Sequence, residues 1–184
     1  MRAPVSVCGP ASAGRGRLKP ALTPEWLIVL GSIVFIIVLA VSAFFEADIR
    51  WLHFFQAWMY VATIVLSLRR NRWGYFIGIG AAGFWAYAGL FVNTFVASGV
   101  RHLMRLDRPD QIIAVPAWLA NAAIVIGCVW AYSRVTKRAS DLVRFAVAVA
   151  LTMAFFALDM QLFQPRYLSL FPRLLHPHWP WVTS

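Results

Sequence analysis

The chain has 184 residues, of which 61% are hydrophobic and 13% are charged, and its formal net charge is +10. Soluble domains carry about 25% charged residues, so this composition excludes a soluble globule and a separate soluble domain. The positive charge does not indicate nucleic-acid binding, because no basic face is interleaved with exposed aromatic residues. It is typical instead of the arginine-rich flanks of membrane helices.

Five apolar stretches fill most of the chain, and each is about as long as the roughly 20 residues that cross a bilayer. The sequence therefore predicts an all-α polytopic membrane protein, a bundle of five transmembrane helices with the lipid bilayer as its main surrounding. The predicted spans are Trp26–Phe45, Trp51–Leu68, Gly74–Val100, Ile112–Tyr132 and Leu142–Phe163.

Two tails flank the predicted bundle of residues 23–163. Residues 1–22 are rich in Ala, Gly, Pro, Ser and Arg, and we expect a disordered, basic cytoplasmic tail. Residues 164–184 are rich in proline and aromatics, which favours an interfacial layer on the outer surface without a long helix. The first helix has an alternative interpretation as a cleaved signal peptide, but its full spanning length and the long tail before it favour a retained helix.

The distribution of Lys and Arg predicts the orientation of the bundle. With the N-terminus in the cytoplasm and the C-terminus outside, the inner segments hold eleven of the 17 Lys and Arg residues. Positive residues favour the cytoplasmic side, so we expect this arrangement, with Arg69–Arg72 as the strongest anchor. The composition suits a bacterial inner membrane.

Small residues recur at every fourth position of the third span. This spacing lets another helix backbone approach closely, and packing then replaces the hydrophobic effect that is missing in lipid. The partner helix belongs either to this chain or to another, so the third helix is also a candidate for self-association or for contact with other membrane proteins. The helix-packing positions are Gly74, Gly78, Ala82 and Ala86.

Tryptophans at intermediate depth are a second packing signal. Indoles at the ends of spans suit the membrane interface, because the ring is apolar and its N–H seeks water. Trp58, Trp85 and Trp118 lie deeper, and we expect them to pack between helices.

Polar residues of the spans concentrate in the predicted outer half. We expect them to surround an outward-opening cavity that is a candidate ligand or partner site. Asp159 is the most informative, because a carboxylate about one turn inside a helix end needs a partner or a wet cavity. The members of this predicted cluster are Glu46, His53, Gln56, Asn93 and Asp159.

The same residues have simpler interpretations. Glu46 and His53 lie near helix ends, where polar side chains reach the headgroups without further function. Asn93 and Asn121 suit hydrogen bonds between helices. The sequence alone does not decide between these roles and a binding site.

Motifs for chemistry are missing. No nucleophile elbow, zinc-binding helix, phosphate loop or dinucleotide fingerprint occurs, and no histidine lies deep enough for haem. Cys8 and Cys128 fall in different environments, so we expect no disulfide. We therefore assign no catalytic residue and expect no cofactor or metal, although an enzymatic role is left open.

Three functional classes remain. The small size and the missing motifs favour a non-catalytic subunit or accessory protein of a membrane complex. The outer polar cluster would also suit a small-solute transporter acting as a homodimer, but the inner half offers almost no polar path. The third class is a membrane enzyme or metal site at the outer face, using His53, Glu46 and Asp159. Substrate, partner and oligomeric state are not readable from the sequence.

Overall fold

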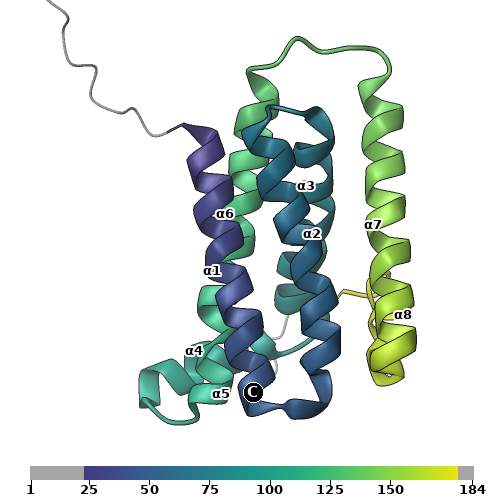
Figure 1. Ribbon diagram of the computed structural model, residues 1–184. Helices are drawn as coiled ribbons and strands as arrows, with labels where there is room; N and C mark the ends of the chain where they lie inside the picture. Colours follow the sequence, from purple (N-terminus) through teal and green to yellow (C-terminus); the bar gives the residue numbers. More distant parts are fainter. Residues whose placement is uncertain (1–22, 178–184) are drawn as a thin grey trace, which may run out of the picture.

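The computed structural model describes residues 23–177, and over these residues the chain is helical without a strand. Five helical segments are long and apolar enough to cross a membrane, which confirms the predicted all-α fold (Figure 1). Residues 1–22 and 178–184, with the tails predicted there, lie outside the described residues. The segments are α1 (Pro24–Phe45), η1 with α2 (Ala47–Ile49, Arg50–Leu68), α3 with the π-helical η2 (Arg72–Tyr87, Ala88–Val92), α5 with α6 (Pro109–Ile112, Ala114–Ser133) and α7 (Asp141–Phe163).

Large apolar side chains cover the outside of the bundle. Leu30, Leu151 and Leu158 are each more than half exposed, and many similar side chains surround them. A contiguous apolar surface of this extent has a high free energy in water and a low one in lipid. Together with the five spans, it identifies the chain as a membrane protein.

The helix α3 lies at the centre of the bundle and packs against α2, α6 and α7. The helix α1 packs against α6 and α2, while α7 lies at the edge beside α3 and α2 (Figure 1). Glycines allow the closest approaches: a Cβ added at Gly78 would lie 2.7 Å from the Cys128 sulfur of α6 and 2.8 Å from Thr63 of α2. The small-residue face therefore contacts helices of this chain at Gly78, and also at Gly74, where it meets α2.

The other two positions of the small-residue face, Ala82 and Ala86, differ in burial. Ala82 is fully buried and Ala86 is half-buried.

The expectation that Trp58 packs between helices is wrong, because its side chain is 57% exposed on the outside of α2. Trp85 and Trp118 are half-buried, and the indole nitrogen of each is enclosed.

The two ends of the bundle differ in character. The connections α2–α3 and α6–α7 lie together with the start of α1 at one end, which we call the basic end (Figure 1). Its two connecting segments carry five Lys and Arg residues: Arg69, Arg70, Arg134, Lys137 and Arg138. The opposite end, which we call the α4 end, holds the α1–α2 turn, α4 (Phe95–Arg105), α5 and the C-terminal helices.

The third span is shorter than predicted. The prediction ran to Val100, but the helix passes into a π-helical turn and stops at Val92. The Asn93 N–H donates to the carbonyl of Ala88, five residues back, and the Asn93 side-chain oxygen accepts from the N–H of Phe95 at 3.0 Å. Asn93 therefore ends one helix, and its side chain accepts from the first residue of the next, a local bond in which a short amide competes with the backbone.

The helix α4 is amphipathic and leaves the bundle direction at this break (Figure 1). Val96, Ala97 and Gly99 are buried, whereas Arg101 and the 74% exposed Met104 point outward. A helix that exposes both basic and apolar side chains suits the membrane interface rather than the hydrocarbon interior of the bilayer.

The segment after α7 folds back under the α4 end. It forms η3 (Pro165–Ser169) and α8 (Leu170–Arg173), two short helices rather than one long one, as the prolines predict. Phe171 packs against Phe84 with ring centroids 5.6 Å apart, and the Tyr87 hydroxyl donates to the Leu174 carbonyl at 3.2 Å. The tail thereby becomes part of the packed structure.

Candidate functional site: a cavity at the α4 end

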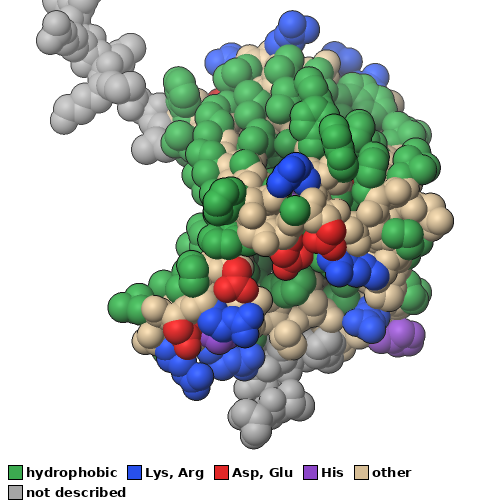
Figure 2. Space-filling view, turned by 60° about the horizontal axis from the view of Figure 1, so that its bottom comes forward, with side chains coloured by type: hydrophobic (Ala, Val, Ile, Leu, Met, Phe, Trp, Pro, Cys, Tyr) green, Lys and Arg blue, Asp and Glu red, His purple; other side chains and the backbone are tan. Residues whose placement is uncertain are grey.

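A cavity of about 470 Å³ lies at the α4 end, and we call it the end cavity. Its lining comes from α1, α2 and α6, from Trp85 of α3, from the break before α4, from the segment around α5, and from η3 with α8. Figure 2 looks onto this end of the molecule and shows side chains of both charges gathered around a hollow. The volume falls in the range of about 300–1,000 Å³ that is usual for small-molecule sites.

Four of the five residues in the predicted polar cluster line the end cavity: Glu46, His53, Gln56 and Asn93. They come from three separate segments of the chain, the end of α1, the first turns of α2 and the break after η2. Asp159 is not on the wall.

Three buried N–H donors on the wall have no hydrogen-bond partner in the structure: Gln56 Nε2, Trp85 Nε1 and Asn93 Nδ2. Gln56 is only 1% exposed. Leaving a buried donor unpaired costs about 1–3 kcal/mol, so most such groups in proteins have partners. All three donors belong to residues that line this one cavity.

The surrounding structure fixes these donors in place. Trp85 packs edge-on against Phe84 and lies 6.0 Å from the ring of Phe156. The Asn93 oxygen is engaged by the cap of α4, which leaves the amide nitrogen of this side chain free. Trp85 was expected to pack between helices and was not assigned to the site, because an indole in an apolar stretch carries no sign of which side its N–H faces.

Charged groups at the mouth hold the cavity wall together. The Arg166 guanidinium lies 2.9 Å from the Asp48 carboxylate and 3.8 Å from that of Glu46. The Gln164 amide also donates to the Asp48 carbonyl at 2.8 Å, so η3 is tied to the α1–α2 turn. Arg173 lies on the wall and is exposed, and no carboxylate of residues 23–177 pairs with it.

Tyr167 adds a further donor to the wall. Burial raises the pKa of the Tyr167 phenol, and the neighbouring Arg166 guanidinium opposes part of this rise. The phenol therefore keeps its proton at neutral pH and is able to donate a hydrogen bond.

Asp159 lies elsewhere on α7, although it is only 4% exposed and neither of its carboxylate oxygens has a partner. It falls between Phe156, which contacts Trp85, and Phe163, which stacks on Phe55 of α2 with centroids 5.1 Å apart. The carboxyl group is thus enclosed where α7 meets α2 and α3, apart from the cavity wall.

The best-connected polar cluster lies at the basic end, and the sequence analysis did not find it. Arg72 donates to both carboxylate oxygens of Asp141 at 2.9 Å, and Asp141 also accepts from the Tyr132 hydroxyl at 3.2 Å and from the Arg138 N–H at 3.0 Å. Arg72 further donates to the Thr136 carbonyl. All these groups are satisfied, so the cluster joins α3, α6 and α7 and offers no open site.

Asn121 has a structural partner in the middle of the bundle. The Tyr60 hydroxyl of α2 donates to the Asn121 oxygen of α6 at 2.9 Å, and the Asn121 amide donates to the Ala117 carbonyl at 2.9 Å. This geometry fits the interpretation of Asn121 as a link between helices.

Among residues 23–177, no three His, Cys, Asp or Glu side chains gather closely enough to hold a metal ion. Cys128 is buried and has no disulfide, and Cys8 lies outside the described residues. No protein family, curated protein or solved structure matches this chain.

Proposed function

We propose that this protein is a non-catalytic integral membrane protein that binds a small molecule in the end cavity, as a subunit or accessory protein of a membrane complex. The observation that carries this proposal is the set of three unpaired N–H donors on one wall: Gln56, Trp85 and Asn93. A ligand with acceptor oxygens in the cavity would offer these residues hydrogen-bond partners, and each pair that formed would contribute to the free energy of binding.

The lining defines the chemistry of this ligand. It carries acceptor oxygens, such as a carbonyl, a carboxylate or a phosphate, for the buried donors and for Tyr167. The apolar side chains of Phe35, Leu52 and Leu170 on the same wall favour an apolar portion as well. Arg173, which has no carboxylate partner among the described residues, favours an anionic group near the mouth.

Transport by a homodimer is the second candidate, and Asp159 is the observation in its favour. A buried, unpaired carboxyl group within a span is typical of residues that exchange protons or ions. Against transport, the cavity lies at the α4 end, and the half of the spans toward the basic end holds few polar side chains that could line a path. Binding without passage is therefore the preferred proposal.

For the placement in the cell, we propose that the basic end faces the cytoplasm of a bacterium and that the end cavity opens outward from the inner membrane. The support is electrostatic: both connecting segments at the basic end are rich in Lys and Arg, which favour the cytoplasmic side.

Native mass spectrometry of protein extracted from its own membrane tests the binding proposal. Wild-type protein should carry a non-covalent small molecule, and Gln56→Leu should lose it, because this change removes one donor and fills space. Gln161→Leu is the matched control: it makes the same change on an exposed position of α7 and should retain the molecule. The proposal would be contradicted if Gln56→Leu retained the small molecule as well as the wild-type protein does, or if the wild-type protein carried no bound molecule.

A further inference from the structure

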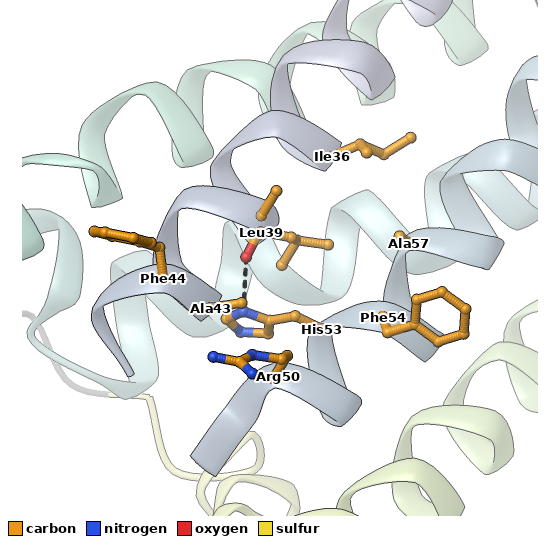
Figure 3. A pocket seen from close by; sticks show the side chains of 9 residues that line it. Ile36, Leu39, Ala43, Phe44, Arg50, His53, Phe54 and Ala57 are labelled. Atoms are coloured by element: carbon orange, nitrogen blue, oxygen red, sulfur yellow. Dashed lines mark hydrogen bonds between the residues drawn. The ribbon is translucent and has the colours of Figure 1, made fainter. Parts of the chain in front are cut away.

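A second pocket lies on the outside of the bundle between α1 and α2, and we call it the α1–α2 groove. It encloses about 460 Å³, and every side chain that lines it is apolar except Arg50 and His53. Figure 3 shows these two side chains together at one end of the groove, while Ile36 lies at the other. Alanines at positions 40, 43 and 57 contribute small side chains, which leave the hollow open.

The length of the groove matches one leaflet of a bilayer. Its lining on α1 extends from Ile36 to Phe44, which corresponds to about 12 Å at about 1.5 Å per residue. A leaflet contributes about half of the roughly 30 Å hydrocarbon core. Since α1 ends at Phe45, the groove begins at the membrane boundary of the α4 end and stops near the middle of the bundle.

Arg50 gives the groove a charged end. It is exposed, and no carboxylate of residues 23–177 pairs with it. The two acidic residues closest in sequence, Glu46 and Asp48, are engaged by Arg166 instead. An arginine without a partner at the end of an apolar groove has the charge and geometry to bind a phosphate.

His53 gives this end a fixed shape. Its Nδ1 lies 3.1 Å from the Leu39 carbonyl, an acceptor, so this nitrogen carries the proton and the ring orientation is set (Figure 3). His53 and Leu39 also line the end cavity, so they separate the two pockets.

From these observations we infer that the α1–α2 groove binds an anionic glycerophospholipid of the leaflet at the α4 end, with an acyl chain in the groove and the phosphate on Arg50. A phospholipid headgroup supplies an anion for the exposed Arg50, which an apolar partner helix would leave without one. The inference does not depend on the proposed function, because Arg50 and the apolar floor at Ala40 belong to the groove alone.

Titration of delipidated protein with single lipids, followed by native mass spectrometry, tests this site. Wild-type protein should bind the first phosphatidylglycerol about fivefold more tightly than phosphatidylcholine with the same acyl chains, the effect expected for one arginine near an anionic headgroup. Arg50→Gln should abolish this preference, and Arg50→Lys should keep it. The control Arg101→Gln, which removes an exposed arginine of α4, should also keep it.

A second variant tests the chain-binding part of the groove. Ala40 is exposed, so Ala40→Trp fills the groove without disturbing the core and should weaken the binding of both lipids several-fold. A preference that survives in Arg50→Gln, or unchanged lipid binding in Ala40→Trp, would overturn the inference. Light scattering tests whether a second copy of the chain occupies the groove instead. If Ala40→Trp dissociates a dimer and leaves lipid binding intact, the groove binds that second copy.

Discussion

The hydrogen bond between Tyr60 and Asn121 crosses the apolar interior of the bundle, where water offers no substitute. We expect Tyr60→Phe and Asn121→Ala each to lower the free energy of unfolding by about 1 kcal/mol, the usual size of such links between membrane helices. Titration with SDS in mixed micelles, followed by circular dichroism, measures this change. If both variants act by removing this one hydrogen bond, the double variant will lose less stability than the sum of the losses in the two single variants.

The second prediction for single residues concerns the ion pair between Arg72 and Asp141. Asp141→Asn should lower the melting temperature in detergent by several degrees, because it leaves the Arg72 guanidinium enclosed without its carboxylate. Arg144→Gln is the control: this arginine lies 3.9 Å from the same carboxylate but is more exposed, and its loss should change the melting temperature far less. Equal changes in melting temperature for the two variants would contradict the structural role assigned to the pair Arg72–Asp141.

Depth along each span predicted part of the polar cluster that lines the end cavity. Glu46, His53, Gln56 and Asn93 were grouped because they lie at one level, and the structure brings these four to one cavity. Depth does not reveal which side of a helix faces which neighbour, so it also placed Asp159 there. For the same reason Arg72 was recognised only as a topology signal, since its partner Asp141 lies 69 residues away.

At the level of the helices, the packing of α3 gives a prediction with an internal control. Gly78→Ala should cost about 1–3 kcal/mol, because the new methyl group would overlap Cys128 and Thr63. Gly83→Ala adds the same methyl group to the same helix, where nothing lies within 4 Å, and should change stability by less than about 1 kcal/mol. The SDS titration compares the two variants directly, and similar losses of stability would contradict close packing at Gly78 as the cause.

The lengths of the helices were predictable to different degrees. Four spans follow from continuous apolar sequence, whereas the third runs through Asn93 and Thr94 without a charge to mark its end. The cap at Asn93 and the amphipathic pattern after it were the available signals, and the apolar run concealed them. The close contact of α1 with α6 through Gly31 and Gly127 was not predicted, although Ala123, Gly127 and Ala131 place small residues at every fourth position of α6.

For the whole molecule, the proposed orientation predicts which end a membrane-impermeant reagent reaches. In a variant lacking Cys8 and Cys128, Leu106→Cys at the α4 end should react with an impermeant maleimide in intact bacterial spheroplasts. Lys137→Cys at the basic end should react only after the membrane is permeabilised, and both should react equally in detergent. The reverse pattern would invert the orientation and place the end cavity on the cytoplasmic side.

The apolar stretches were sufficient to predict five helices long enough to cross a membrane, apart from the end of the third, because hydrocarbon thickness sets the length of a spanning helix. The order of packing was not predictable, because in lipid every face of these helices is apolar and hydrophobicity no longer distinguishes inside from outside. The central position of α3 follows from its small residues, and the edge position of α7 is visible only in the structure.

The C-terminal segment from Pro165 to Arg173 is a wall of the end cavity and is fastened to the α1–α2 turn through Arg166. If the end cavity binds the proposed ligand, a reporter fused directly after Arg173 would therefore compete with that ligand for space. For binding measurements, a tag should therefore precede α1, which begins at Pro24 at the opposite end of the bundle.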